Sequence, residues 1–212
     1  MRLIYVSLPL SLLLIGAGIY LATRPAPTIE GNIADLEPRH PVTKIMLDEA
    51  ERLKLKSAPE IQLPDSDGKE QSLSKDKPTV VLFIKEGCPC SIDAQPIMNK
   101  LAEKFKGKAQ FLGIIDVDGQ KQKQWIAENR PVFPIVADTS LNLMKGYGAL
   151  NSVYTFLVGP DHRIEKMWPG YWVDMLKELN ARLCKDISEK VTEFDPLYAP
   201  IAKSSGCAYH IP

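Results

Sequence analysis

Two cysteines one residue apart, Cys88 and Cys90, are the side chains whose type and spacing best suit chemistry in this sequence. The two residue steps between them span at most ~7 Å, and the Cα atoms of a disulfide usually lie ~4.4–6.8 Å apart. The pair can therefore form a disulfide bond. Because the ring would be small and strained, the bond should be easily reduced, which favours a redox-active disulfide over a structural one.

The position of the pair in the chain favours a reactive thiolate. It follows the apolar, β-branched run at residues 79–84, predicted to be a buried strand, and precedes a helical pattern over residues 91–106. Free N–H groups and positive partial charge at a helix N-terminus stabilise a thiolate. Lys85 should add to this effect and Glu86 should oppose it, whereas Pro89 suits the start of a helix.

Two other interpretations of the pair stay open. Buried cysteines often act as small hydrophobic side chains, and two close thiolates suit a soft metal such as copper. A metal site needs further ligands, and no histidine has ligand spacing to the pair; the three are His40, His162 and His210. We therefore predict neither a bound metal nor a cofactor, and keep a copper-binding carrier as an alternative function.

The other two cysteines, Cys184 and Cys207, are candidate resolving thiols. Cys184 ends a helical pattern, and Cys207 lies in the segment SSGCAY, predicted to be flexible. An exposed, unpaired thiol outside the cytoplasm is a liability, which favours a partner for Cys207. The candidate partners are Cys88, Cys90 and Cys184, and the alternative is that Cys207 is an incidental exposed thiol.

The overall charge gives no indication of a nucleic-acid partner. Lys and Arg number 26, Asp and Glu also number 26, and no long basic run occurs. A nucleic-acid-binding chain normally carries a basic patch or stripe. We therefore predict no nucleic-acid partner.

The first 23 residues have the pattern of a membrane segment. No charge occurs from Leu3 to Thr23, and about 20 apolar residues cross the hydrocarbon core. A cleaved signal peptide is the alternative. Residues 24–42 contain four prolines and are predicted to be a linker. The chain is thus predicted to be a single-pass membrane protein with its domain on the extracytoplasmic side.

Residues 43–185 are predicted to form one α/β domain, followed by a tail at residues 186–212. Parallel strands joined by helices, with a hairpin at one edge, indicate a sandwich of helices on a mixed sheet. The predicted strands are residues 79–84, 110–115, 133–137, 153–158 and 163–167, and the predicted helices are residues 43–56, 91–106, 118–129, 141–147 and 173–184.

Several segments in order resemble the redoxin branch of the thioredoxin superfamily. They read SAPEIQLPDSDGKEQSLS, PTVVLFIKEGCPCSIDAQPIMNKLAEKF, FLGIIDVDGQ, FPIVADTSLNLMKGYGA and VYTFLVGPDHRI. This branch contains membrane-anchored thiol–disulfide oxidoreductases and alkyl hydroperoxide reductase/thiol-specific antioxidant proteins. The resemblance implies a thioredoxin-like three-layer sandwich over residues 57–184. It also implies exchange with protein or small-molecule disulfides, or reaction with peroxide.

The sequence departs from the branch at three places. Members of the branch carry a Cys-x-x-Cys pair, whereas the two cysteines of this sequence are separated by a single residue. When the sequences are matched, Cys90 takes the position of the second cysteine and Gly87 that of the first. The loop that carries a cis-proline in the branch reads Ser152-Val153-Tyr154, and the Thr and Arg of peroxidase sites are missing. We therefore predict a thiol–disulfide oxidoreductase that uses Cys88 and Cys90, with a thiol peroxidase as the alternative.

Overall fold

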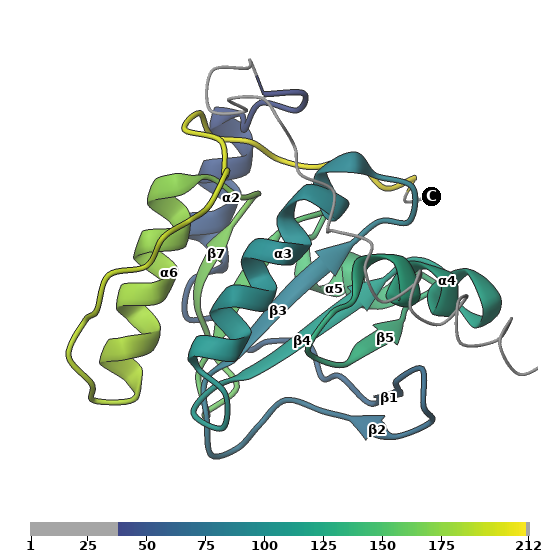
Figure 1. The fold of residues 1–212 in the computed structure, drawn as a ribbon, viewed down its shortest axis with the longest axis horizontal. Helices are drawn as coiled ribbons and strands as arrows, with labels where there is room; N and C mark the ends of the chain where they lie inside the picture. The colour runs from purple at the N-terminus through teal and green to yellow at the C-terminus, as the bar shows by residue number, and fades with distance from the viewer. Residues whose placement is uncertain (1–37, 211–212) are drawn as a thin grey trace, which may run out of the picture. The chain divides into compact units, whose positions relative to one another are not determined.

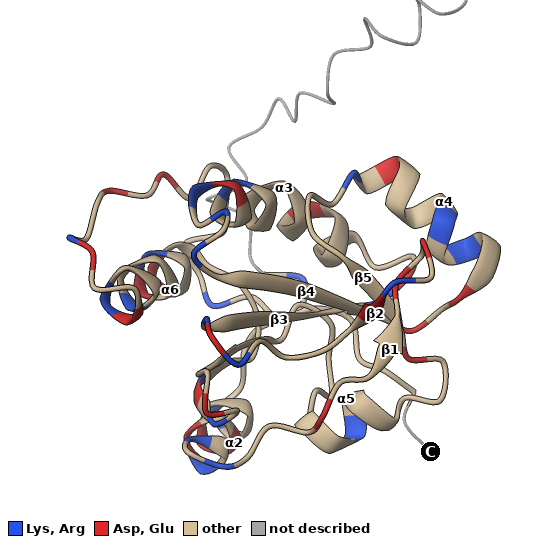
Figure 2. Cartoon of the chain, turned by 90° about the horizontal axis from the view of Figure 1, so that it is seen from below, with Lys and Arg blue, Asp and Glu red and all other residues tan. Residues whose placement is uncertain are grey.

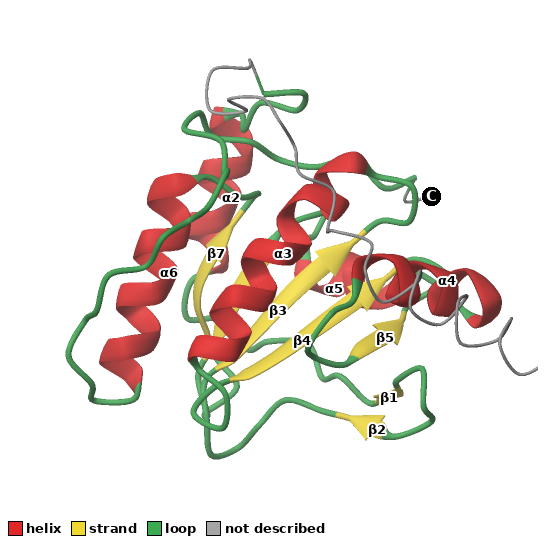
Figure 3. Cartoon of the chain, viewed as in Figure 1, coloured by secondary structure: helices red, strands yellow, loops and turns green. Residues whose placement is uncertain are grey.

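The structure is a computed structural model that describes residues 38–210. The predicted membrane segment and residues 24–37 of the predicted linker lie outside the described residues. Among those described, no helix is both long and apolar enough to cross a membrane. Figure 1 shows the fold and Figure 3 its helices and strands.

The central sheet has five strands in the order β5-β4-β3-β6-β7. β3 pairs parallel with β4 and antiparallel with β6, so the sheet is mixed, as predicted. A separate two-stranded hairpin is formed by β1 and β2. The strands are β1 Leu63–Pro64, β2 Glu70–Gln71, β3 Thr79–Ile84, β4 Gln110–Ile115, β5 Ile135–Ala137, β6 Thr155–Val158 and β7 Ile164–Trp168.

The helices cover both faces of the sheet. Figure 2 shows α3, α4 and α6 on one face and α2 and α5 on the other. Lys and Arg are interspersed with Asp and Glu over these elements, in agreement with the balanced charge. The helices are α2 Lys44–Leu53, α3 Pro89–Lys104, α4 Gly119–Asn129, α5 Asn142–Tyr147 and α6 Val173–Asp186.

Strand β3 is the centre of the core because every one of its six residues is buried. Alternate side chains enter the two apolar layers: Leu82 packs on the α3 and α6 side, and Phe83 packs on the α2 and α5 side. The ring of Phe83 lies 5.3 Å from that of Tyr147 and 5.6 Å from that of Phe156, centroid to centroid. This burial on both faces explains the continuous apolar run in the sequence.

Glycine is needed in the middle of β4. A Cβ on Gly113 would lie 2.9 Å from Ile84 Cδ1 and closer still to Ile135 Cδ1. These isoleucines come from the neighbouring strands β3 and β5. The missing side chain lets both isoleucines pack over the centre of the sheet.

The C-terminal tail differs from its prediction as a flexible segment. In Figure 1 it runs back along α6 and over the end of the sheet to the loop between β3 and α3. Ser204, Ser205 and Tyr209 are buried. The tail is fixed by backbone hydrogen bonds, which local sequence patterns do not reveal: Val42 N–H to Lys203 O (3.0 Å), and Tyr209 N–H to Leu150 O (2.9 Å). Residue 42, predicted to end a linker, is thus part of the folded domain.

Candidate functional site

Cys88 occupies the junction between β3 and α3. It is the N-cap residue of α3, with φ −84° and ψ 118°, and Pro89 opens the helix. The backbone N–H groups of Ser91 and Ile92 donate to the Cys88 carbonyl at 3.0 and 3.3 Å. The helix begins two residues earlier than its apolar pattern predicts, because proline is preorganised for the first helical position. Cys90 therefore lies in the first turn.

The sulfur of Cys88 is enclosed and hydrogen-bonded. Ser152 Oγ donates to it at 3.2 Å, and the backbone N–H of Cys207 donates at 3.3 Å. The residue is 1% exposed, and Cys90 is 4% exposed. Donors aimed at a buried sulfur stabilise its ionised form.

The two neighbouring cysteines take opposite protonation states. The hydrogen bond from the Cys90 thiol, with those from Cys207 and Ser152, lowers the pKa of Cys88 to about 3 against the effect of burial. The hydrogen bond to Cys88, burial and the charge of Cys88 together raise the pKa of Cys90 far above that of an ordinary thiol. At neutral pH the site thus holds a thiolate at Cys88 and a thiol at Cys90.

Cys207 completes a group of three sulfurs. Its thiol hydrogen-bonds to the Cys88 thiolate, and burial together with this bond raises the pKa of Cys207 to about 11. Nε2 of His40 lies 3.5 Å from Cys207 Sγ. The side chain is only partly buried, unlike those of Cys88 and Cys90.

Lys85 and Glu86, which were expected to act on the charge of the thiolate, make other contacts. Lys85 Nζ donates to the carbonyl of Ala208 at 2.6 Å, so it holds the tail. Glu86 is exposed, and its backbone N–H donates to Asp116 Oδ1 at 2.8 Å. The largest contributions to the pKa of Cys88 come from hydrogen bonds and burial, and neither Lys85 nor Glu86 is among them.

The loop that precedes β6 approaches Cys88 through Ser152. Val153 belongs to the same apolar cluster as Cys88, whereas Tyr154 belongs to the cluster on the opposite face of the sheet. Val153 has φ +56° and donates its N–H to Phe83 O at 2.6 Å. A β-branched residue rarely adopts a positive φ, so this loop is strained where it meets the site.

Cys184 lies apart from the other thiols. It is buried on α6. Within residues 38–210, its sulfur makes no hydrogen bond to Cys88, Cys90 or Cys207. All four cysteines are free. Of the two candidate resolving thiols, the structure brings only Cys207 to the pair.

Three polar residues at the site are not among the residues predicted from the sequence. Ser152 and His40 are brought to the sulfurs by long-range folding, and no local pattern marks them. Asp93 follows Cys90 by three residues, and this spacing places both side chains on one side of a helix. The spacing is therefore a sequence signal that points to Asp93 as a neighbour of the site. Burial and the Cys88 thiolate raise the pKa of Asp93, while Arg39 lowers it.

The described residues contain no group of three or more His, Cys, Asp or Glu side chains arranged to hold a metal ion. Cys88 instead interacts with both Cys90 and Cys207, so its sulfur is placed to exchange disulfide bonds with either of them and with a partner.

Solved structures share this fold at low sequence identity. An uncharacterized conserved protein from Geobacillus kaustophilus matches with TM-score 0.60 and 22% identity, covering 75% of this chain and 93% of its own. The thioredoxin domain of a thiol-disulfide oxidoreductase from Bacteroides vulgatus matches with TM-score 0.56 and 21% identity, covering 61% and 97%. A putative thiol:disulfide interchange protein DsbE from Chlorobium tepidum matches with TM-score 0.57 and 18% identity, covering 63% and 97%.

These likenesses confirm the predicted thioredoxin-like fold. No curated protein matches the chain. The model of the AhpC/TSA family matches residues 55–167, more than half of the sequence, and the matched segment includes β3, Cys88, Cys90 and the loop at Ser152. The predicted resemblance to the redoxin branch is thereby confirmed at the level of the family: the chain belongs to the AhpC/TSA family.

Proposed function

We propose that this protein is a thiol–disulfide oxidoreductase whose redox pair is Cys88 and Cys90. The observation that carries the proposal is the Cys88 sulfur at the N-cap of α3, where Ser152 Oγ, the Cys207 N–H and the Cys90 thiol donate to it. A thiolate is the form of cysteine that attacks disulfides. A low thiol pKa also makes Cys88 a good leaving group when the reaction runs backwards.

The cycle has two exchange steps. The Cys88 thiolate attacks one sulfur of a disulfide, forming a mixed disulfide and releasing the other sulfur as a thiolate. Cys90 then loses its proton and attacks Cys88, which closes the Cys88–Cys90 disulfide and releases the second thiolate. Two electrons pass from the pair to the substrate.

The acidity of Cys90 changes at the right moment in this cycle. Its pKa is raised by its hydrogen bond to the Cys88 thiolate and by the negative charge of that sulfur. Both causes disappear once Cys88 enters a mixed disulfide, so the Cys90 thiol then becomes easier to ionise. The second step is thereby favoured only after the first has occurred.

The proposed location is outside the cytoplasm, with the domain held at a membrane. The support is the uncharged run from Leu3 to Thr23, whose length suits a membrane-spanning helix. Disulfide exchange as a stable activity also suits an oxidising compartment.

The test is disulfide reduction by the full-length chain, with insulin as the protein substrate and Cys184→Ala as the control variant. We expect Cys88→Ser to lose activity by about 100-fold or more, because a hydroxyl cannot replace the thiolate nucleophile. Cys90→Ser should trap mixed disulfides on the chain. Unchanged turnover in both variants would refute the proposal.

The enclosure of Cys88 favours a second candidate, a thiol peroxidase. A residue that is 1% exposed is reached more easily by a small peroxide than by a protein disulfide. The Cys88 thiolate would attack the O–O bond and become a sulfenic acid while the other oxygen leaves as water or an alcohol, and a neighbouring thiol would then displace water. Peroxide consumption with dithiothreitol as electron donor, lost in Cys88→Ser, would select this function.

A further inference from the structure

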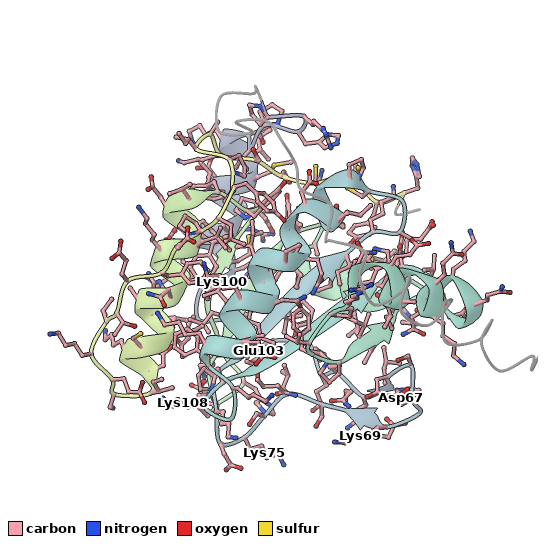
Figure 4. All side chains as sticks on the ribbon, in the orientation of Figure 1. Asp67, Lys69, Lys75, Lys100, Glu103 and Lys108 are labelled. Atoms are coloured by element: carbon pink, nitrogen blue, oxygen red, sulfur yellow. The ribbon has the colours of Figure 1, made fainter. Side chains whose placement is uncertain are left out.

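The tail covers the redox pair and is held there along its whole length. Three lysines spaced four residues apart, Lys100, Lys104 and Lys108, contact the first half of the tail. Lys100 forms an ion pair with Asp195 at 2.7 Å, and Lys108 forms one with Glu189 at 2.7 Å. Lys104 Nζ donates to the carbonyls of residues 192 and 193. Figure 4 labels Lys100 and Lys108 among the side chains of this region.

The second half of the tail docks on the site through its backbone. Ser152 N–H donates to Cys207 O at 3.0 Å, and Asn151 Nδ2 donates to Gly206 O at 2.8 Å. Ser205 N–H donates to His40 O at 2.7 Å. These bonds set the position of Cys207 relative to the loop that also supplies Ser152 to the Cys88 sulfur.

Two glycines allow the close approach. A Cβ on Gly206 would lie 2.6 Å from Ser152 O, and one on Gly170 would lie 2.7 Å from the carbonyl carbon of Ser204. Gly170 also has φ +154°. A side chain at either position would push the tail away, so the sequence is compatible with this docked arrangement only because both residues are glycine.

The docked tail leaves one sulfur of the three accessible. Cys88 and Cys90 are buried, whereas Cys207 is partly exposed and contacts the Cys88 thiolate. A large disulfide-bearing partner cannot reach Cys88 while the tail is in place. The partner can reach Cys207.

We propose that Cys207 is a third redox thiol, which carries disulfide exchange between an external disulfide-bearing partner and the buried pair, with His40 as its proton acceptor. This inference rests on the proposed function of Cys88 and Cys90 and specifies how a partner reaches them. The imidazole nitrogen 3.5 Å from Cys207 Sγ is placed to accept the thiol proton.

The relay consists of three balanced exchanges. His40 takes the Cys207 proton, and the Cys207 sulfur attacks the partner disulfide; one partner sulfur leaves and takes that proton. The Cys88 thiolate then attacks Cys207, which forms the Cys88–Cys207 bond and releases the second partner sulfur as a thiolate. Finally Cys90 attacks Cys88, and Cys207 leaves with the proton that Cys90 loses. The partner gains two electrons, the pair loses two, and Cys207 returns to its starting state.

Two trapping experiments on the full-length chain test the intermediates. Oxidised Cys90→Ser should accumulate a Cys88–Cys207 disulfide, and Cys88→Ser mixed with insulin should carry the partner on Cys207. Each bond is located by blocking free thiols and mapping peptides by mass spectrometry. Finding the partner on Cys88 in Cys90→Ser, with Cys207 free, would overturn the relay.

The rate of exchange supplies an independent measurement. Cys207→Ser should slow reduction of insulin by about tenfold or more, because the exposed nucleophile is lost, whereas Cys184→Ala should match the unaltered chain. A Cys207→Ser rate equal to or above that of the unaltered chain would overturn the relay and leave the pair intact. Failure of the proposed function itself is distinguishable, since Cys88→Ser and Cys90→Ser would then also be active.

Discussion

The backbone N–H of Cys207 donates to the sulfur of Cys88 across 3.3 Å, although the two cysteines are 119 residues apart in the chain. The donor comes from a tail that lies beyond the residues matched by the family model, and the acceptor lies within them. The thiolate of the family domain is therefore stabilised in part by a segment outside the matched domain.

The ionisation of Cys88 should make the stability of the reduced protein depend on pH. The pKa of Cys88 is about 3 in the folded protein and ~8.5 in an unfolded chain. A lowered pKa stabilises the fold fully above the unfolded value, and this contribution is lost as pH falls towards the folded value. Cys90 and Cys207 have raised pKa values in the folded protein and ionise in the unfolded chain only as pH approaches ~8.5, so well below that pH they stay protonated in both states and add no slope.

Urea unfolding under reducing conditions measures this effect. We expect the difference in unfolding free energy between the unaltered chain and Cys88→Ser to shrink steadily from pH 8.5 to pH 5. The stabilisation begins to be lost at the unfolded pKa of ~8.5 and decreases as the pH falls below it. A difference that stays constant over this range would contradict an ionised Cys88.

Removing the hydroxyl of Ser152 should raise the pKa of Cys88. Ser152 Oγ donates to the sulfur at 3.2 Å, and a hydrogen bond to a charged group contributes ~1.5–3 kcal/mol, or about one to two pKa units. Thiolate absorbance at 240 nm, followed against pH, reports the shift in Ser152→Ala. Ser204→Ala is the matched control because its hydroxyl bonds to the Ala202 carbonyl instead.

Displacing the tail should expose Cys88. In Gly206→Ala the added methyl group would meet Ser152 O at 2.6 Å, so the tail must move away. We expect labelling of Cys88 by a bulky maleimide to accelerate by about tenfold or more, since the thiolate is the reactive form and becomes accessible. Ala202→Ser, an exposed change in the same tail, should label at the original rate.

Replacing His40 should slow reactions at Cys207. The His40 Nε2 atom lies 3.5 Å from Cys207 Sγ, and a positioned base typically contributes ~10²–10⁴-fold to a proton transfer. In His40→Gln we expect slower alkylation of Cys207 by iodoacetamide at pH 7, read by peptide mapping. His210→Gln controls for loss of an exposed histidine in the tail, and equal rates in both variants would exclude the base.

Filling the space above Gly113 should destabilise the sheet. In Gly113→Ala the new methyl group would crowd Ile84 and Ile135, and overpacking a core costs about 1–3 kcal/mol of unfolding free energy. Adding Ile135→Val removes the Cδ1 atom nearest the new methyl group and should recover part of the loss. No recovery in the double variant would show that the strain lies elsewhere.

The sequence predicted the central elements closely. The predicted strands at residues 79–84 and 110–115 match β3 and β4 at both ends, because continuous β-branched and apolar runs mark strands buried on both faces. Thr43 lies at the start of the helix predicted over residues 43–56 and caps α2, accepting from Met46 N–H. Helix α3 begins two residues before its apolar pattern, because Pro89 is preorganised for the first helical position.

The sequence did not predict the tail or the polar contacts of the pair. Cys207, Ser152 and His40 meet through backbone pairing between segments that are distant in the chain, and such pairing leaves no periodic pattern. The glycines that permit it, Gly170 and Gly206, look like ordinary turn residues in the sequence. Local signals therefore identified the redox pair but not the groups that control it.

The amide of Cys207 is also a spectroscopic reporter built into the protein. Its proton points at a sulfur that is negatively charged in the reduced pair and neutral in a disulfide. Its nitrogen–proton resonance in a nuclear magnetic resonance spectrum should therefore differ strongly between the two redox states. Isotopic labelling of cysteine alone would then allow the oxidation state of the site to be followed without any attached dye.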